Sequence, residues 1–512
     1  MTMTAAVQLN GISKRFGAVQ ANREVSFTVA SGTVHGLVGE NGAGKSTLMA
    51  ILYGYYQADA GSIEIDGKPV QIANSHQAIA LGIGMVHQHF MLVDPLTALD
   101  NIMLGAEGGF FLQASKAKAR ARLNQLMQET GLQVRLDKLV SDLPVGEMQR
   151  LEILKALYRG ARILILDEPT AVLTPQETLQ LFEVLKRLRA MGTTIILITH
   201  KLKEVMALCD EVTVMRAGQV VHSTLIGNTS PEQLAEAMVG RKVNLGRQAA
   251  AQAANDEVRL IAQGLSLRDI NGVTRLHEVS LSLKAGEIVG VAGVSGNGQS
   301  ELLEVLSGMQ APDAGRMTLA GQQFAQQGWL DPKSARALKL AHVPEDRHAC
   351  GMVMSFPAWE TAVLGYQSNA QYRSGASMNH AAMRAATAEM QERFDVRPRD
   401  PNLGSSKFSG GNQQKLILAR EIGEKPAVLL VGQPTRGVDI GAIEFIHNQL
   451  RALRDAGCAV LLVSSELDEI LALADRVVVM NGGRITGELG IDQCDEKTLG
   501  LLMASTITEQ AA

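Results

Sequence analysis

Residues 39–46 read G-E-N-G-A-G-K-S and follow a short apolar run, in full agreement with the P-loop pattern. Its glycines let the backbone wrap an anion without Cβ clashes, so that the amide N–H groups point inward. A helix that starts directly after the loop adds the positive end of its dipole. The pattern predicts a strand, a phosphate loop and a helix, with Lys45 on the β- and γ-phosphates and Ser46 on Mg²⁺.

A pair of carboxylates follows a second apolar run. The stretch I-L-I-L-D-E-P-T ends at Thr170 and predicts a buried strand over residues 163–166. Asp167 at the end of this strand is placed to hold the Mg²⁺ shell, and Glu168 to polarise the attacking water. Such a pair alone is often only a helix cap, but together with the phosphate loop it favours nucleotide hydrolysis.

Both motifs recur further along the chain. G-V-S-G-N-G-Q-S begins at Gly293, 254 positions after Gly39, and V-L-L-V-G-Q-P-T ends at Thr435, 265 positions after Thr170. A repeat of several ordered motifs indicates two copies of one domain. The low-complexity stretch R-Q-A-A-A-Q-A-A-N-D-E near the join predicts a linker. We therefore expect domains at residues 1–243 and 258–512, with the linker at residues 244–257.

Composition and periodicity indicate the fold class. The 512 residues are 46% hydrophobic and 20% charged, which is typical of a globular protein with an ample core. Short apolar runs such as 163–166 and 194–198 alternate with longer amphipathic stretches such as 175–189, which predicts an α/β fold with a mostly parallel sheet. Residues 115–130 predict a separate surface helix with a basic first half.

Charge and cysteine usage exclude several classes of function. Lys and Arg total 48 against 52 Asp and Glu, so the net charge of −4 gives no basic excess for a nucleic acid. No run approaches the ~18 apolar residues that a membrane span needs, and residues 1–10 lack a secretory signal. Four scattered cysteines without metal spacing predict free thiols in a reducing cytosol. We expect a cytosolic protein that can dock on a membrane.

Both halves resemble the nucleotide-binding domain of ABC-type ATPases over nearly the whole chain. The resemblance implies two tandem P-loop domains of this type, each with a mostly parallel sheet and a helical subdomain, which bind ATP and Mg²⁺. It implies a Mg²⁺-contacting loop glutamine at Gln88 in M-V-H-Q-H-F and a switch histidine at His200 in I-L-I-T-H. Phe16 in K-R-F-G fits the aromatic residue that stacks on adenine. The loop residues implied to bind ATP are Gly39, Glu40, Asn41, Gly42, Ala43, Gly44, Lys45, Ser46 and Thr47.

The second half departs from the family at most catalytic positions. Glutamine in place of Lys45 cannot neutralise phosphate, and a hydrogen bond to a charged group contributes ~1.5–3 kcal/mol, about twice a neutral one. A glycine for Asp167 and a glutamine for Glu168 offer neither a metal ligand nor a base. We expect no hydrolysis in this half, although its glycines leave nucleotide binding open. Gln299 stands in place of Lys45, Gly432 in place of Asp167 and Gln433 in place of Glu168. Glu345 stands at the position of Gln88, and Ser465 at the position of His200.

The signature loop of the family shows the opposite bias. The first half reads L-P-V-G-E-M-Q, where Pro144 has neither a hydroxyl nor a backbone N–H, and Thr174 stands where the second half has an aspartate. The second half reads F-S-G-G-N-Q-Q and R-G-V-D. Its residues implied to contact the γ-phosphate side are Ser409, Gly410, Gly411 and Asp439.

In ABC ATPases, as the resemblance implies, two domains pair head to tail, and each nucleotide lies between one P-loop and the other signature. The intact P-loop of the first half would then face the intact signature of the second half. All losses fall on the other composite site. The sequence thus predicts one hydrolytic site, catalysed by Lys45, Glu168 and His200, and one structural or regulatory site.

The tandem form with a degenerate second half is similar to the ATPases of ribose- and galactoside-type importers. The strings M-V-H-Q-H-F-M-L-V and G-Q-P-T-R-G-V-D are closest to the nucleoside-importer branch that works with a basic membrane lipoprotein. This resemblance implies a peripheral subunit at the cytoplasmic face of the membrane that energises import of a nucleoside or simple sugar. It also implies two integral-membrane permease subunits and an extracytoplasmic solute-binding lipoprotein as partners.

A soluble tandem ABC ATPase of translation or DNA repair is the alternative. Such proteins commonly keep both sites intact and carry basic linkers or zinc modules. Here the join is uncharged over most of its length, the net charge is negative and the cysteines do not cluster. These features favour the importer and no nucleic-acid partner.

Overall fold

The computed structural model describes residues 5–17, 19–87, 90–106, 112–170, 173, 175–244, 246–248, 256–294, 296–375 and 377–504. The chain divides into two compact units, residues 1–243 and residues 244–512. Each unit has one antiparallel sheet and one six-stranded, mostly parallel sheet with helices packed around it. The predicted α/β fold class is therefore confirmed.

The antiparallel sheet of the first unit has the order β2-β1-β4-β5. Buried and partly exposed positions alternate along much of β1, as expected when one face of a sheet packs on a core and the other meets solvent. The strands are β1 (Ala5–Phe16), β2 (Val19–Ala30), β4 (Ala60–Ile65) and β5 (Lys68–Val70).

The mostly parallel sheet of the first unit has the order β10-β9-β3-β8-β7-β6. Its central strands are buried along their whole length, because helices cover both faces of a parallel sheet. Ile198 at the end of β8 lies opposite Leu37 of β3 and opposite Asp167 of β7, so these three strands end side by side. The strands are β3 (Val34–Gly39), β6 (Ile83–Val86), β7 (Ile163–Asp167), β8 (Thr194–Ile198), β9 (Glu211–Arg216) and β10 (Gln219–Leu225).

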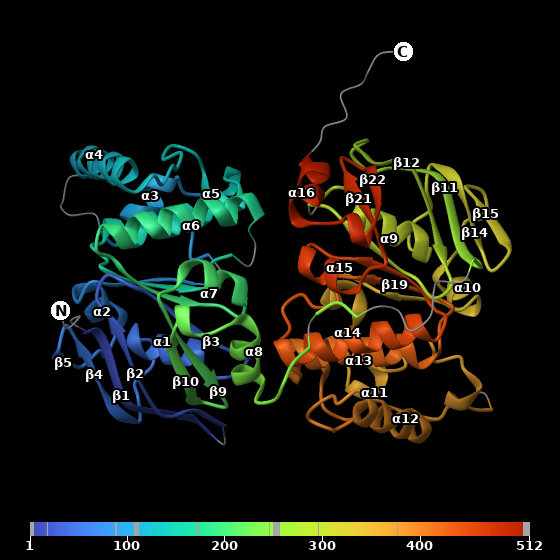
Figure 1. Cartoon of the computed structure of the whole chain (residues 1–512), viewed down its shortest axis with the longest axis horizontal. Coiled ribbons are helices and arrows are strands. Elements are labelled where there is room, and N and C mark those ends of the chain that lie inside the picture. Colours follow the sequence, from blue (N-terminus) through green and yellow to red (C-terminus); the bar gives the residue numbers. More distant parts are fainter. Residues whose placement is uncertain are drawn as a thin grey trace, which may run out of the picture. The chain divides into compact units, whose positions relative to one another are not determined.

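In the first unit, α3, α4 and α5 gather at one end, and the antiparallel sheet lies at the other end (Figure 1). Ser230 and Gln233 form a reciprocal capping box at the start of the last helix of this unit. The helices are α1 (Lys45–Leu52), α2 (Ser75–Ala80), α3 (Ala98–Met103), α4 (Leu112–Thr130), α5 (Val145–Tyr158), α6 (Pro175–Ala190), α7 (Leu202–Leu208) and α8 (Pro231–Val239).

The second unit repeats this plan with sheets ordered β12-β11-β14-β15 and β16-β19-β20-β13-β21-β22, and a small ribbon β17-β18. Its strands are β11 (Val258–Arg268), β12 (Thr274–Lys284), β13 (Ile288–Ala292), β14 (Ala314–Leu319), β15 (Gln322–Ala325), β16 (Leu340–Val343), β17 (Arg373–Ser374), β18 (Ser377–Met378), β19 (Val428–Gly432), β20 (Ala459–Val463), β21 (Arg476–Asn481) and β22 (Arg484–Gly490).

A single π-helical turn, Arg347–Gly351, follows β16 and has no counterpart among the described residues of the first unit. Single π-turns often mark functional segments. The helices of the second unit are α9 (Gln299–Ser307), α10 (Pro332–Ala337), α11 (Ala358–Thr361), α12 (His380–Arg393), α13 (Gly410–Gly423), α14 (Ile440–Asp455), α15 (Leu467–Leu473) and α16 (Glu496–Ala504).

Several elements expected from the sequence are found at the expected places. Strands expected at residues 163–166 and 194–198 are β7 and β8, and the helix expected at residues 175–189 is α6. The basic stretch at residues 115–130 lies within α4, which packs on α5 and α3.

Part of the segment expected to link the domains is bound to the second unit. The backbone N–H of Asn244 donates to the Glu444 carboxylate at 2.8 Å. The guanidinium of Arg451 donates to the carbonyl oxygen of Gly246, also at 2.8 Å. Residues 249–255 of this segment lie outside the described residues.

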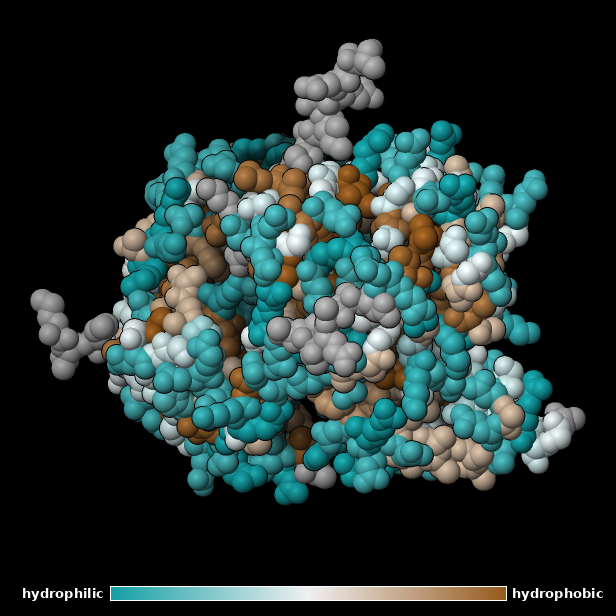
Figure 2. Space-filling model, turned by 45° about the vertical axis from the view of Figure 1, so that its right-hand side comes forward, coloured by the Kyte–Doolittle hydropathy of each residue, from teal (hydrophilic) through white to brown (hydrophobic). Residues whose placement is uncertain are grey.

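One face of the molecule carries mainly polar side chains. On the face drawn in Figure 2, hydrophilic residues predominate and hydrophobic residues appear in small groups between them. In the part of the chain that the structure describes, none of the helices combines the length and the apolar character that a membrane crossing requires.

Burial of β7 predicts a specific stability effect. Leu164 is fully buried between neighbouring strands, so Leu164→Ala should lower the free energy of unfolding by about 2–5 kcal/mol through lost contacts and a cavity. Leu179→Ala makes the same chemical change on α6, where the side chain is 65% exposed, and should change it by no more than about 0.5 kcal/mol. Urea unfolding followed by circular dichroism measures both. Equal effects would contradict the assigned core.

Candidate active site

The loop after β3 turns back on itself before α1 begins. Gly44 has φ 95° and precedes the helix, and a Cβ atom placed there would lie 2.3 Å from the carbonyl oxygen of Ala21. Gly42 also has a left-handed φ, of 82°, but has open space beside it. Gly44 is thus required by both backbone conformation and close packing, and Gly42 by backbone conformation alone. The result is a concave run of backbone at a helix start.

The side chain of Lys45 folds over this loop. Its Nζ donates to the carbonyl oxygens of Gly39 at 2.7 Å and Glu40 at 3.0 Å, and the residue is only 6% exposed. Burial lowers the pKa of Lys45, while the charges of Glu168, Asp167 and Glu40 act in the opposite direction. The ammonium group of Lys45 is therefore held at the loop by backbone carbonyl oxygens, from which an anionic ligand can attract it.

Asp167 ends β7 beside the first turn of α1. The Ser46 side chain lies close enough to the carboxyl group to lower its pKa. Burial raises the pKa of Asp167, and the neighbouring charge of Glu168 acts in the same direction, against the effects of Ser46 and Lys45. A hydroxyl and a carboxylate thus lie close together next to the loop between β3 and α1, which we call the phosphate-type loop, as we do the matching loop before α9 in the second unit. Both are hard oxygen ligands of the kind that Mg²⁺ prefers.

Glu168 adopts an unusual backbone conformation. Its φ of 47° lies in the left-handed region, which is strained for a side chain other than glycine, and its N–H donates to the carbonyl oxygen of Ile198 at 2.8 Å. Its carboxylate lies 2.9 Å from Nδ1 of His200, which follows β8. Burial by itself raises the pKa of Glu168, but the hydrogen bond and charge of His200 and the charge of Lys45 outweigh burial, and the pKa is lowered.

The structure brings together most of the residues predicted for this site. Lys45, Ser46, Asp167, Glu168 and His200 meet where β3, β7 and β8 end. Glu40, Asn41, Ala43 and Thr47 belong to the same loop and the first turn of α1. Gln88, predicted as a metal contact, lies outside the described residues.

Phe16 lies at the end of β1 and is 42% exposed. Its ring meets Tyr56 edge-on, with ring centroids 5.1 Å apart, and the ammonium group of Lys14 lies 5.6 Å from its centroid. An exposed aromatic face of this kind can accept a planar ring.

Two structural supports of the site carry no sequence motif. Asn22 is fully buried, and its side-chain amide donates to the carbonyl oxygen of Gly44 at 3.0 Å, which braces the phosphate-type loop. Glu204 on α7 is 6% exposed and accepts hydrogen bonds from the hydroxyls of Thr170 and Thr199. It thereby ties the segment after Glu168 to the segment before His200. Only a structure could reveal these residues, because no spacing rule marks them.

The signature-type loops of both units lead into a helix, α5 in the first unit and α13 in the second. Ser409 takes the cap position of α13 without a side-chain hydrogen bond to the helix backbone, and its hydroxyl accepts a hydrogen bond from the Asn412 side-chain amide at 2.8 Å, while Gly410 and Gly411 open the helix. Asp439 caps α14 by accepting from the N–H of Ala442 at 2.8 Å. In the first unit, Pro144 takes the cap position of α5 without a side-chain hydrogen bond. Thr174 lies outside the described residues.

The second unit repeats the backbone of the site with different side chains. Gln433 has the same φ of 47° as Glu168, and its side-chain oxygen accepts from the N–H and the hydroxyl of Ser465 at 3.1 and 3.0 Å. Gln299 stands at the position of Lys45 and donates to the carbonyl oxygen of Val294 at 3.2 Å. The hydroxyl of Ser300 donates to Glu345.

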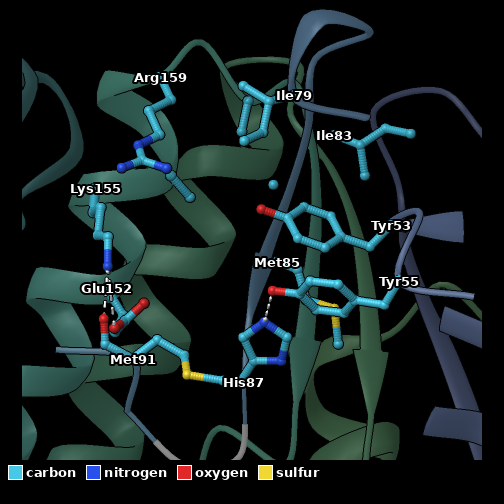
Figure 3. Close-up of a pocket in the computed structure, with 13 residues that line it drawn as sticks. Tyr53, Tyr55, Ile79, Ile83, Met85, His87, Met91, Glu152, Lys155 and Arg159 are labelled. Atoms are coloured by element: carbon cyan, nitrogen blue, oxygen red, sulfur yellow. Dashed lines mark hydrogen bonds and ion pairs between the residues drawn. The ribbon is translucent and has the colours of Figure 1, made fainter. Parts of the chain in front are cut away.

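A separate pocket opens in the first unit beside β6 (Figure 3). Tyr53 and Tyr55 from the segment after α1 form one wall, and Glu152 and Lys155 of α5, with Arg159 directly after it, form the opposite wall. The floor and rim include Met85, His87 and Met91.

Aromatic and charged contacts shape this pocket. The rings of Tyr55 and His87 stack with centroids 5.5 Å apart, and the Tyr55 hydroxyl lies 3.3 Å from Nε2 of His87. Lys155 donates to the carbonyl oxygen of Met91 at 2.8 Å and lies 3.7 Å from Glu152. Tyr55 and Met91 are each more than half exposed, so apolar surface is offered to solvent next to fixed charges.

Comparisons with known proteins agree with this geometry. The sequence model of the family described as ABC transporter matches residues 22–171 and 276–436. The guanosine import ATP-binding protein NupO of Bacillus subtilis is 43% identical over 99% of this chain and 99% of its own length. The ribose import ATP-binding protein RbsA of Chromobacterium violaceum is 38% identical over 96% of both chains.

One solved structure aligns with both units together. A crystal structure of an archaeal ribosome recycling factor in complex with a ribosomal stalk protein gives a TM-score of 0.64 and covers 96% of this chain and 92% of that chain. The sequences are only 18% identical, so this likeness shows the fold alone.

The resemblance drawn from the motifs is thus confirmed by full-length relatives as well as by two family matches. The loop after β3, the acidic pair after β7 and the histidine after β8 occupy one sheet edge, and their counterparts recur in the second unit. The chain belongs to the ABC transporter family and carries two of its ATP-binding domains.

Proposed function

We propose that the chain energises import of a solute by hydrolysing ATP at the active site of its first unit. The observation that carries the proposal is the contact of Glu168 with His200 beside Lys45 and the Ser46–Asp167 pair. The second unit has lost the lysine, both carboxylates and the histidine at the corresponding positions. Hydrolysis therefore belongs to the first unit.

Each residue of the first unit has a role that its contacts support. The loop from Gly39 to Thr47 cradles the phosphates with backbone N–H groups, and Lys45 leaves its carbonyl partners for the β- and γ-phosphate oxygens. Ser46, Asp167 and Gln88 would hold Mg²⁺, and the Ser46–Asp167 pair fits that ion. When bound, Mg²⁺ would offset the negative charge of the phosphates.

Glu168 acts as the base toward the attacking water. Its lowered pKa keeps the carboxylate ionised at neutral pH, and its left-handed backbone directs it away from the strand. His200 is a positioning residue that holds the carboxylate through its ring nitrogen, at 2.9 Å. Phe16 is proposed to stack on the adenine ring through its exposed face.

The two units are proposed to pair head to tail, so that the signature of the second unit completes the first site. Ser409, Gly410, Gly411 and Asp439 retain the groups that this role needs, whereas Pro144 lacks them in the first unit. The losses in the second P-loop and in the first signature then fall on the same composite site. Such segregation is expected when one site hydrolyses and the other regulates.

The solute is proposed to be a nucleoside or a simple sugar, because full-length relatives are named as guanosine and ribose import proteins. The partners are two integral-membrane permease subunits and an extracytoplasmic solute-binding lipoprotein. The chain then works as a peripheral subunit at the cytoplasmic face of the membrane.

The pocket beside β6 is the proposed docking site for a cytoplasmic helix of a permease subunit. It offers the exposed side chains of Tyr55 and Met91 to apolar residues, and Lys155 and Arg159 to an acidic one (Figure 3). Amphipathic helices bind grooves with this combination of surfaces. Because His87 directly precedes Gln88 in the chain, the pocket lies next to the segment proposed to sense Mg²⁺ and nucleotide.

Glu168→Gln should abolish essentially all hydrolysis while ATP binding is kept. The amide cannot accept the proton, and general-base catalysis contributes about 10²–10⁴-fold in rate. Phosphate release and equilibrium ATP binding measure the two effects. Glu183→Gln, which changes an exposed carboxylate on α6, should behave as the parent chain. Turnover near the parent rate in Glu168→Gln would place the chemistry in the second unit.

His200→Ala should move the acidic limb of the ATPase pH profile toward higher pH. Without the hydrogen bond and charge of His200, only the charges of Lys45 and Lys201 act against burial, so the pKa of Glu168 rises and protonation of the base begins at a higher pH. Ser465→Ala at the matching position of the second unit should leave the profile in place. An unshifted limb in His200→Ala would show that His200 does not set the ionisation of Glu168.

Met91→Glu should prevent co-purification with the permease subunits, because a carboxylate replaces an apolar contact that is 57% exposed at the rim of the pocket. Met191→Glu makes the same change at a 52% exposed position after α6 and should keep the complex. Affinity purification from detergent-solubilised membranes measures both, with the unfolding midpoint as a check of folding. Tight association of the parent chain with ribosomes or DNA in place of membrane proteins would instead support a soluble tandem ATPase.

A further inference from the structure

An arginine lies beside the signature loop of the second unit. Arg347 begins the π-helical turn after β16, and its Nη1 donates to the carbonyl oxygen of Arg436 at 2.9 Å. Its other terminal nitrogen, Nη2, lies against Gly410, the first residue of α13, where an added Cβ atom would be 2.8 Å from it. The guanidinium group thus lies between the loop that holds Ser409 and the loop that leads to Asp439.

The turn that carries Arg347 is fixed by its own contacts. The carboxylate of Asp346 accepts from the N–H groups of His348 and Ala349, at 2.8 and 3.0 Å, at the start of the turn. Nε2 of His348 lies 3.0 Å from the side-chain oxygen of Gln413 on α13. The turn is therefore attached to the same helix that begins at the signature loop.

The positive charge of Arg347 has no acidic partner of its own. Among the described residues, no carboxylate forms an ion pair with its guanidinium group, and its buried Nε has no hydrogen-bond partner. Burial and the neighbouring charge of Arg436 lower the pKa of Arg347, against the effect of Asp346. An anion bound at this place would relieve the repulsion between the two guanidinium groups and compensate the burial of one of them.

The corresponding positions of the first unit carry a different pair of side chains. Phe90, two residues after Gln88, stands where the second unit has Arg347, and Val145 stands at the position of Gly410. A Cβ atom at the position of Gly410 would collide with the guanidinium group, so a valine there and the observed arginine exclude each other. The arginine thus accompanies the signature loop that keeps its serine and both glycines.

We propose that Arg347 binds the terminal phosphate of ATP, together with the signature loop of the second unit, in the composite site that the P-loop of the first unit completes. It rests on the proposed function, and in particular on head-to-tail pairing. A guanidinium group binds phosphate oxygens through parallel N–H donors, and a positive charge fixed at a transferring phosphoryl group stabilises its transition state. ADP lacks the terminal phosphate, so this contact distinguishes ATP from ADP and is lost after hydrolysis.

Removal of the guanidinium group from the full chain tests the proposal. Arg347→Ala should lower kcat/KM for ATP by about 10- to 100-fold, the factor that corresponds to one hydrogen bond to a charged group. ADP binding should stay at the parent level, because the first unit holds the phosphates that ADP retains. Arg373→Ala, the same change at an exposed position of β17, should leave both quantities unchanged. Phosphate release and equilibrium ADP binding measure them.

Chemical rescue separates a charged phosphate contact from a merely structural tie between two loops. Guanidinium chloride, at concentrations well below those that unfold the chain, should restore part of the hydrolysis of Arg347→Ala, because the cation can enter the space that the side chain leaves. Urea has nearly the same shape without the charge and should restore nothing. Sodium chloride at the same concentration controls for ionic strength, and the unfolding midpoint verifies that the variant is folded.

A parent rate in Arg347→Ala would overturn the proposal, as would an equal loss of ADP binding. Rescue by urea as effective as rescue by guanidinium, or no rescue of a folded variant, would also overturn it. Failure of the proposed function is distinguishable, because Glu168→Gln tests it. Loss of turnover in Glu168→Gln with a parent rate in Arg347→Ala would reject only the arginine contact. Retained turnover in Glu168→Gln with a loss in Arg347→Ala would reject only the assignment of hydrolysis to Glu168.

Discussion

The site depends on one constraint, which is that neighbouring parallel strands end at the same edge of a sheet. β8 lies between β3 and β7, and its last residue, Ile198, is opposite both Leu37 and Asp167. The loop after β3, a carboxylate pair more than a hundred residues later and a histidine after the next strand can therefore meet. One face of the sheet shares a core with α1 and the antiparallel sheet, so the edge where the strands end is the place where polar groups can gather without burial of unpaired charge.

The two units share a backbone conformation at the site but carry different side chains on it. Glu168 and Gln433 share a φ of 47°, and the N–H of each donates at 2.8 Å to the last residue of the neighbouring strand, Ile198 or Val463. Glu168 is bound to a histidine and Gln433 to a serine. The strained turn is thus a property of the fold, and the side chain placed on it decides whether a base is present. The second unit thus keeps the backbone turn of the site without the carboxylate.

The units also differ in which side chains can fit beside the loop serine. Glu345 and a side chain at position 432 cannot occupy the same space, so the carboxylate beside Ser300 can come from β19 or from the loop after β16, but not from both. The π-helical turn that follows also places Arg347 against the signature side of the unit, where its guanidinium donates to the carbonyl oxygen of Arg436 at 2.9 Å. One short segment thereby contacts both the phosphate-type loop and the neighbourhood of Ser409.

The sequence alone determined the α/β class, the tandem repeat and the residues of the first site, because each is encoded in a short local pattern with a known backbone requirement. Only the tertiary structure revealed that Glu345 is bound to Ser300, that Glu204 ties Thr170 to Thr199, and that Asn22 braces the phosphate-type loop. Those contacts join residues that are distant in the chain. Their meeting depends on strand order and packing, so no periodic pattern in the sequence predicts it. Sequence could name the lost groups of the second unit, but steric fit between segments decided what took their place.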